Sequence, residues 1–107
     1  MVKYTNEKII NLLKSFVRKV NRKFKLEQVI LFGSRARGDY LNISDVDLIL
    51  VSKDFENLSF RERIIQIIGY WDAYVDIEVL CYTPEEFNRK KKEIGIVRYA
   101  VNEGIEL

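Results

Sequence analysis

The sequence lacks histidine, has a single cysteine and contains no long apolar run, and each shortage excludes a class of function. Without histidine among its 107 residues, the chain has no Ser-His-Asp or Cys-His nucleophile, no HExxH zinc helix and no imidazole acid–base catalyst. The lone Cys81 excludes an internal disulfide and any CxxC metal or redox site. Chemistry must therefore rest on carboxylates, hydroxyls, Lys, Arg or a bound metal.

The apolar residues form only short runs. The longest, such as residues 29–32 and 48–51, reach four residues, which is far too short to span a membrane. The first ten residues lack the apolar core of a secretory signal, so we expect a cytoplasmic protein. With 48% apolar and 32% charged residues, the chain is typical of a globular protein, and residues 1–107 are predicted to form one domain.

Charge is distributed unevenly, although the net charge is only +2. Residues 1–25 carry eight Lys or Arg against one acid, whereas the remainder carries ten basic and fifteen acidic residues. A basic leading helix could contact a phosphate-bearing or acidic partner, but a solvated lysine-rich helix face is the simpler interpretation. The run Arg89-Lys90-Lys91-Lys92 allows the same two interpretations, with RNA or an acidic partner as the alternative to a solvated face. We expect no direct binding of nucleic acid.

The pattern of apolar residues predicts an α/β (α+β) fold. A helix is expected over residues 5–24 with Thr5 as its N-cap, and strands over residues 28–32, 45–51 and 74–80. Ser59 and Thr83 are expected to cap two further helices, the first of which should bury Ile64, Ile65, Ile67 and Ile68. A last helix over residues 94–103 should end at Gly104. The order α-β-α-β-α-β-α favours a small mixed sheet of about three strands covered by helices.

Two short motifs could carry chemistry. Asp45 and Asp47 should share one face of a strand, where two carboxylates repel each other unless a cation such as Mg²⁺ or Mn²⁺ lies between them. Gly33-Ser34, at the end of the preceding strand, would let backbone N–H groups approach an anion. Taken alone, each motif fits an ordinary solvated strand end or turn. The spacing is not that of a Walker A loop.

Further charged residues adjoin these motifs. Arg35 and Arg37 follow the glycine turn, where they could contact phosphate or could simply be surface arginines. Asp76 and Glu78 should share one face of the third predicted strand. If that strand lies beside the Asp45-x-Asp47 strand, Asp76 could complete a cluster of three carboxylates that holds one or two metal ions for phosphoryl or nucleotidyl transfer.

The combination of Gly33-Ser34, ten residues, Asp45-x-Asp47 and a later strand acid resembles the polymerase-beta-type nucleotidyltransferase superfamily. Its length and the GSRARG sequence are most similar to the minimal nucleotidyltransferases that are paired with HEPN-domain proteins in toxin–antitoxin systems. The resemblance implies a palm-like core in which Gly33 and Ser34 hold a nucleoside triphosphate. It also implies that Asp45 and Asp47 bind Mg²⁺, and that Asp76 is a third ligand or the base that takes the acceptor proton, with Glu78 as its rival.

The same resemblance implies an activity and its partners. Such enzymes transfer a nucleoside monophosphate, here expected to be AMP from ATP, to a hydroxyl and release pyrophosphate. In the HEPN-linked group the acceptor would be a tyrosine of the toxin, and the modification would silence it. A masking antitoxin without catalysis is the alternative, and transfer to a small molecule or RNA is a third possibility. Because one small domain has little surface left to define an acceptor, we expect a homo-oligomer or a complex with the HEPN protein.

Overall fold

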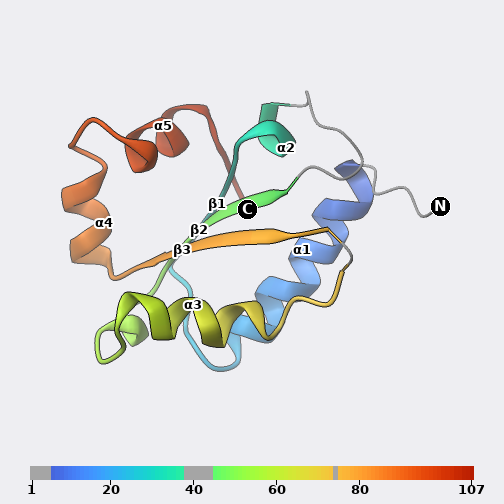
Figure 1. Ribbon diagram of the computed structural model, residues 1–107, viewed down its shortest axis with the longest axis horizontal. Coiled ribbons are helices and arrows are strands. Elements are labelled where there is room, and N and C mark those ends of the chain that lie inside the picture. The colour runs from blue at the N-terminus through green and yellow to red at the C-terminus, as the bar shows by residue number, and fades with distance from the viewer. Residues whose placement is uncertain (1–5, 38–44, 74) are drawn as a thin grey trace.

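The computed structural model describes residues 6–37, 45–73 and 75–107 (Figure 1). The chain forms an α/β structure, as the sequence predicts. The elements, in chain order, are α1 (Asn6–Asn21), β1 (Gln28–Phe32), α2 (Ser34–Arg37), β2 (Val46–Val51), the 3-10 turn η1 (Lys53–Phe55), α3 (Phe60–Ile68), β3 (Ile77–Tyr82), α4 (Pro84–Lys90), α5 (Ile96–Glu103) and β4 (Ile105–Glu106). None of the helices in these ranges is long and apolar enough to cross a membrane.

The sheet is mixed and has the strand order β3-β2-β1-β4. β2 is antiparallel to β1 and parallel to β3, which requires the crossover that α3 provides. The two-residue strand β4, which the sequence did not predict, adds a fourth strand beside β1. Gly104 permits this close approach, because a Cβ at this position would lie 2.7 Å from Ile30 Cγ2 and 2.8 Å from the Leu31 carbonyl oxygen.

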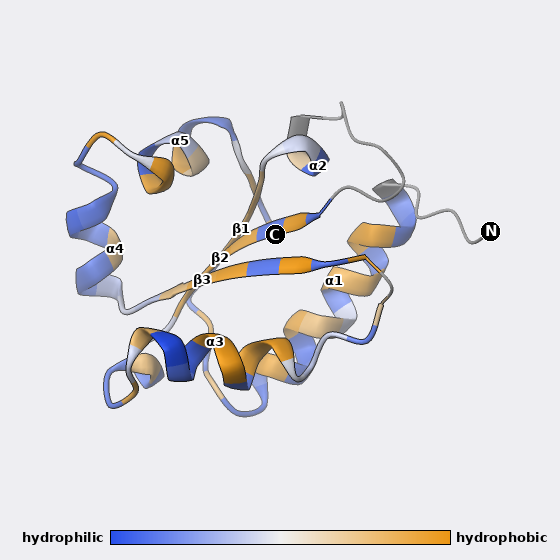
Figure 2. Cartoon of the chain, in the orientation of Figure 1, coloured by the Kyte–Doolittle hydropathy of each residue, from blue (hydrophilic) through white to orange (hydrophobic). Residues whose placement is uncertain are grey.

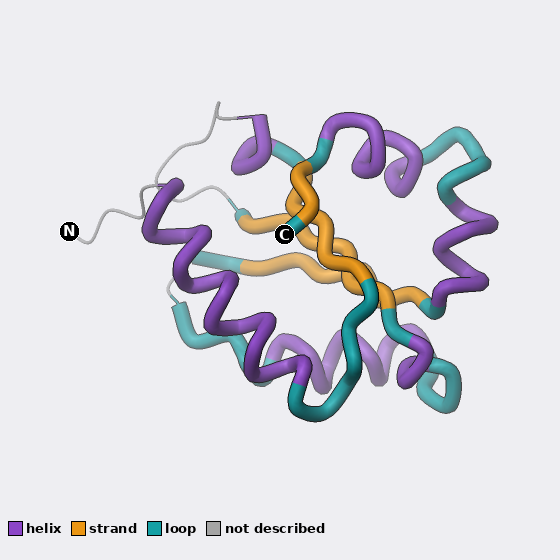
Figure 3. The backbone as a smooth tube through the Cα atoms, turned by 180° about the vertical axis from the view of Figure 1, so that it is seen from behind, coloured by secondary structure: helices purple, strands orange, loops and turns teal. Residues whose placement is uncertain are grey.

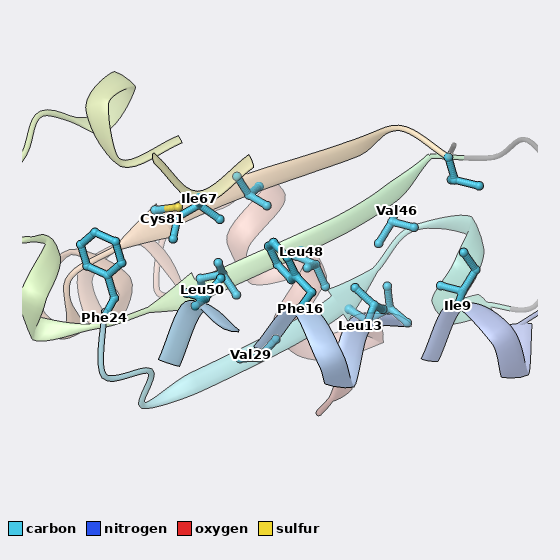
Figure 4. Close-up of a cluster of buried hydrophobic side chains, with 14 of the residues drawn as sticks. Ile9, Leu13, Phe16, Phe24, Val29, Val46, Leu48, Leu50, Ile67 and Cys81 are labelled. Atoms are coloured by element: carbon cyan, nitrogen blue, oxygen red, sulfur yellow. The ribbon is translucent and has the colours of Figure 1, made fainter. Parts of the chain in front are cut away.

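The two faces of the sheet bury separate apolar clusters. On one face, α1 and α3 pack against alternate strand residues, and Figure 4 shows the side chains between α1 and the strands. Seen from behind, α1 runs along this face (Figure 3). The other face is covered by α4 and α5 through Phe87, Val97 and Ala100. Figure 2 shows that the helices turn their apolar sides toward the sheet and their polar sides outward.

Several predicted element boundaries differ from the structure. β3 begins at Ile77 and continues to Tyr82, so the predicted strand over residues 74–80 starts too early and stops too soon. Likewise β2 begins at Val46, and α5 begins at Ile96 after an N-cap at Gly95. Asp45 and Asp76 therefore precede their strands, where the ladder ends and side chains gain access to solvent.

The first helix is also shorter than predicted. α1 ends at Asn21, whose side-chain Oδ1 accepts a hydrogen bond from Leu26 N at 2.8 Å and so holds the chain that turns toward β1. Phe24 is buried although it lies beyond the helix, because it packs against Phe55 with ring centroids 5.1 Å apart. Helical spacing of apolar residues therefore overextended this element. The predicted N-cap, Thr5, lies outside the described residues.

The predicted buried side of α3 is partly wrong. Ile67 is buried as expected and Ile64 is half-buried, but Ile65 and Ile68 are 55% and 41% exposed. Arg63, one turn before Ile67, takes the inward position instead. The caps fit the sequence better: the Ser59 hydroxyl accepts from Glu62 N, and Thr83 forms a complete capping box with Glu86.

Candidate active site

The end of β1 and the starts of β2 and β3 lie at the same end of the sheet, and they bring the predicted site residues together. β1 ends at Phe32, which lies opposite Asp47 near the start of β2. β3 begins at the same level, since Val46 pairs with Ile77 and Asp47 with Glu78. The glycine turn after β1 and the acids at the starts of β2 and β3 therefore lie side by side, although they are spread over residues 33–78.

Asp47 and Glu78 share one face of the sheet. Val46 and Leu48, the neighbours of Asp47 in the strand, are completely buried on the opposite face, so the Asp47 side chain points to the α4–α5 side. Val46 N donates a 2.9 Å hydrogen bond to the Asp76 carbonyl, which places Asp76 next to Asp45. Glu78 pairs directly with Asp47. The condition set by the sequence, that the third strand lies beside the Asp45-x-Asp47 strand, is thus met.

Gly33 connects the turn to the carboxylates. Its φ of +77° is the left-handed conformation that side chains disfavour. A Cβ at this position would overlap Asp47 Oδ2 and lie 3.3 Å from Asp47 Cγ. The carboxylate of Asp47 therefore rests directly on the backbone of Gly33, and a glycine is required both by the turn and by this contact. The spacing of the motifs did not predict this contact.

The residues after Gly33 have different environments. Ser34 is half-buried and starts the four-residue helix α2. Arg35 is completely buried, so the alternative prediction of an exposed surface arginine is wrong for this residue. Burying a charged group costs free energy unless the group has partners, and Arg35 does have a partner in the structure. The side chain of Arg37, the last residue of α2, lies outside the described residues, and phosphate contact by either arginine stays a prediction.

The donor set suits a hard divalent cation. Asp45, Asp47, Asp76 and Glu78 offer only carboxylate oxygens, the ligands that Mg²⁺ and Mn²⁺ prefer. Within the described residues no three acidic, histidine or cysteine side chains converge closely enough to form a finished metal site. A cavity of about 410 Å³ opens beside Asp45, Asp76 and Glu78 and is bounded by Trp71 and Ile68. The Trp71 indole, which donates to the Val75 carbonyl at 2.7 Å, packs as predicted where α3 meets the third strand.

A second charged cluster lies at the opposite end of β3. The Arg63 guanidinium donates to the carbonyls of Phe55, Leu58 and Cys81 at 2.9, 3.0 and 3.1 Å. It also forms an ion pair of 2.6 Å with Glu86, whose carboxylate accepts from Thr83 N as well. The sequence patterns did not predict this cluster, because nothing in the order of residues indicates that an arginine within an isoleucine-rich helix points inward.

Opposing influences act on the pKa of Glu86. Partial burial on its own would raise the pKa of this carboxyl, but the hydrogen bonds and charge of Arg63 and the hydrogen bonds from Thr83 lower it overall. Neighbouring Cys81 is a free, buried thiol, as predicted, and burial raises its pKa to about 12. The surroundings therefore favour the charged form of Glu86 and the neutral form of the Cys81 thiol.

A mixed sheet covered by helices, with carboxylates at the strand ends beside a glycine turn, is the arrangement that the resemblance to nucleotidyltransferases implies. A family model described as the nucleotidyltransferase domain matches residues 13–105, which is most of the chain. The chain belongs to this family, and its enzyme class is nucleotidyltransferase. The resemblance inferred from the Gly33-Ser34 and Asp45-x-Asp47 motifs is thereby confirmed at the level of the family.

Relatives and solved structures agree with this assignment. A protein of Methanocaldococcus jannaschii named as a putative protein adenylyltransferase is 41% identical over 71 residues, which cover 64% of this chain and 72% of that protein. The protein adenylyltransferase MntA of Thermococcus cleftensis is 28% identical over 79 residues, or 74% and 77% of the two chains.

Among solved structures, a nucleotidyltransferase of Sulfolobus solfataricus, also named as putative, has a TM-score of 0.68 and 29% identity over 94% of this chain and 80% of its own. A toxin–antitoxin crystal structure with AMP-PNP shares the fold at a TM-score of 0.51 and 21% identity, over 95% and 71% of the two chains.

Proposed function

We propose that the protein transfers AMP from ATP to a hydroxyl group of a partner protein in a Mg²⁺-dependent reaction. The observation that carries the proposal is the strand pairing that places Gly33, Asp45, Asp47 and Asp76 at the same end of the sheet. Such a site can position a triphosphate and neutralise charge, which is what nucleotidyl transfer requires of a protein without histidine. The relatives named as protein adenylyltransferases support a protein as the acceptor.

Each residue has a distinct role in this proposal. Asp45 and Asp47 hold Mg²⁺, which when bound neutralises phosphate charge and orients the triphosphate. Gly33 and Ser34 bind the phosphates through their backbone and hydroxyl groups. Asp76 accepts the proton of the attacking hydroxyl or completes the metal site. Gly33 also keeps the Asp47 carboxylate in place, because that carboxylate rests against its Cα.

We further propose that the acceptor is a tyrosine of a HEPN-domain toxin and that the protein acts as its antitoxin. The cavity beside Asp45, Asp76 and Glu78 is open, and in this proposal the acceptor protein supplies the rest of the pocket. This arrangement favours a hetero-complex, a homo-oligomer or both. The HEPN partner is the part of the proposal that comes from the motif resemblance.

A transfer experiment tests this function. The protein is incubated with α-labelled ATP, Mg²⁺ and the protein encoded beside it, and label is measured on each chain. We expect label on the partner, its removal by a phosphodiesterase that releases AMP, and loss of labelling with EDTA. The double variant Asp45→Asn/Asp47→Asn should reduce the rate at least about a thousandfold, because the charge that holds the metal is gone.

A matched variant controls for loss of acidic charge in general. Asp72 is an exposed carboxylate on the loop between α3 and β3, where it pairs with Lys19 at 3.6 Å. Asp72→Asn should label the partner at the wild-type rate. Co-purification and silencing of the partner without any transfer of label would contradict the catalytic proposal and favour masking by contact alone.

A further inference from the structure

We propose that the acceptor protein presents its hydroxyl on an extended, acidic segment that lies along the outer edge of β3 and anchors an apolar side chain in a groove beside α4. This inference rests on the proposed function, because it concerns how the acceptor of that reaction is held. It assigns a role to the basic run of residues 89–92, which the catalytic site does not use.

The groove lies on the same face of the sheet as Asp47 and Glu78. It has a volume of about 450 Å³ and is lined by Phe60, Leu80, Tyr82, Glu86, Arg89, Lys90 and Ile96. Along β3, Glu78, Leu80 and Tyr82 alternate onto one face, so the groove begins where the carboxylate site ends. Phe60 and Tyr82 stack with ring centroids 5.5 Å apart and form an apolar wall. An acceptor that reaches the carboxylates can therefore also fill this groove.

The outer edge of β3 can pair with an extended segment over a short stretch. β3 is the last strand in the order of the described sheet. The carbonyls of Asp76 and Tyr82 accept hydrogen bonds from the β2 side, from Val46 N and Ser52 N. In a parallel ladder the residues alternate in direction, so Ile77, Val79 and Cys81 direct their backbone groups outward.

Arg63 limits this open edge. Its guanidinium donates to the outward carbonyl of Cys81 at 3.1 Å, which leaves the backbone of Ile77 and Val79 as the pairing positions. Both positions flank Glu78, so a segment that pairs there passes directly beside the carboxylates. Strand addition of this kind supplies backbone hydrogen bonds for affinity, and pockets for alternate side chains supply specificity.

The charge of the groove selects an acidic partner. Arg89 and Lys90 line it, and within the described residues neither forms a salt bridge. The one acid in the lining, Glu86, is neutralised by its 2.6 Å ion pair with Arg63. Lys91 and Lys92 extend the positive charge beyond the groove. An apolar wall beside unpaired cations and an open strand edge fits a peptide with an apolar anchor flanked by Asp or Glu.

The geometry also fixes the spacing within the acceptor sequence. A strand advances about 3.3 Å per residue, so the groove residues Leu80 and Tyr82 lie roughly 13–20 Å beyond Asp76, the proposed base. The apolar anchor should therefore be about four to six residues away from the hydroxyl residue in the acceptor. A hydroxyl residue and an apolar residue at this spacing, flanked by acids, can be recognised in the sequence of a partner protein.

Peptide binding tests the inference without requiring catalysis. The probe is a short fluorescein-labelled peptide that carries a tyrosine, a leucine at this spacing and a glutamate on each side of the leucine. Binding is measured by fluorescence anisotropy with the full chain at low and moderate salt. Arg89→Glu/Lys90→Glu should weaken binding at least about tenfold. The matched pair Lys14→Glu/Arg18→Glu, exposed on α1 against the other face, changes the net charge equally and should alter binding less than about twofold.

Further variants separate this inference from the proposed function. Asp45→Asn/Asp47→Asn should still bind the peptide, and Arg89→Glu/Lys90→Glu should still bind Mg-ATP. The peptide-binding inference and the proposed catalytic function can therefore be contradicted independently of each other. A peptide N-methylated at its pairing positions should bind at least about fivefold more weakly, because it cannot donate to the edge. Equal weakening by both charge pairs, undiminished binding of the methylated peptide, or preferential binding of an RNA oligonucleotide over the peptide would overturn the inference.

Discussion

The two ends of β3 carry charged clusters with opposite designs. At the amino end, Asp76 and Glu78 lie next to Asp45 and Asp47, so four acidic residues gather at one end of the sheet. At the carboxyl end, Arg63 and Glu86 form a compact ion pair whose polar atoms are occupied by backbone carbonyls and a helix cap. The two clusters are separated only by the length of β3, which has six residues.

This difference contrasts three exposed acids, Asp45, Asp76 and Glu78, with a cluster in which one ion pair is enclosed by hydrogen bonds. Like charges side by side oppose folding and are tolerated where a cation or substrate can neutralise them. The Arg63 cluster is satisfied internally and gains nothing from a ligand. We therefore expect substitutions at the amino end to reduce activity and leave stability intact, and those at the carboxyl end to do the reverse.

The largest effect should come from the third carboxylate. Asp76→Asn should lower the rate of AMP transfer about a hundredfold to a thousandfold, because it removes either a proton acceptor or a metal ligand. Glu78→Gln should lower it less than about tenfold, since Glu78 is a neighbour of Asp47 and not the assigned base. Initial rates with labelled ATP would check both. The reverse order of effects would assign the third carboxylate to Glu78, and a lower thermal midpoint in Asp76→Asn would contradict the contrast between the two ends.

Loss of the ion pair should give the next largest effect, on stability. Glu86→Ala should lower the free energy of unfolding by about 3 kcal/mol, because the buried Arg63 charge loses its partner and α4 loses part of its cap. Chemical denaturation checks this value. Glu85→Ala, at the exposed neighbouring position in the same helix turn, should change stability by no more than about 0.5 kcal/mol. Equal losses in the two variants would show that general helix electrostatics, and not the ion pair, stabilises this end.

The sequence was most informative about the carboxylate end of this comparison. Alternation at Asp45-x-Asp47 and at Asp76-x-Glu78 predicts which side chains share a face, and this property depends only on neighbouring residues. The pairing of the two strands was also needed to bring the acids together, and the sequence left it as a condition that the structure meets. Even so, the choice between Asp76 and Glu78 depends on the position of a ligand and could not be derived from alternation.

Long-range contacts set the limit of prediction elsewhere. The apolar pattern of α3 favoured four isoleucines as its buried side. Arg63 nevertheless takes an inward position, because two carbonyls of the turn before α3 and one of β3 accept hydrogen bonds from its guanidinium. Strand β4 has two residues, too few for any periodic signal, and depends on the close contact between Gly104 and β1. The contact of Gly33 with Asp47 was likewise invisible, because glycine in a turn is ordinary until its neighbour is known.

A smaller effect on stability, with a separate effect on activity, is expected for the glycine turn. Gly33→Ala should cost about 1–2 kcal/mol, since φ is +77° and the new methyl group meets the Asp47 carboxylate. It should also displace Asp47 and so lower the transfer rate more than the stability loss explains. Gly69→Ala is the matched control, because Gly69 has helical angles and ordinary space, and should be neutral or slightly stabilising. Wild-type activity in a folded Gly33→Ala protein would show that Asp47 needs no support from this turn.

The smallest effect concerns pH and the sign of the Glu86 contribution. The pKa of Glu86 is lowered in the folded protein from an ordinary value of 4.5. The unfolded chain therefore binds the proton more readily, and the charge of Glu86 stabilises the fold at pH values above 4.5. That contribution should disappear as the pH falls below 4.5 and through the lower folded pKa.

Chemical denaturation of the wild type and of Glu86→Gln from pH 7 to pH 3 measures how much the Glu86 charge contributes to the free energy of unfolding. The difference in unfolding free energy should be constant near neutrality and should shrink in the acidic range, where both proteins carry a neutral group at position 86. A difference that stays unchanged down to pH 3 would mean that hydrogen-bond geometry and packing, and not the carboxylate charge, hold Arg63 in place. Packing and neutral hydrogen bonds would then stabilise the carboxyl end of β3, and the two ends of the strand would no longer differ in how they use charge.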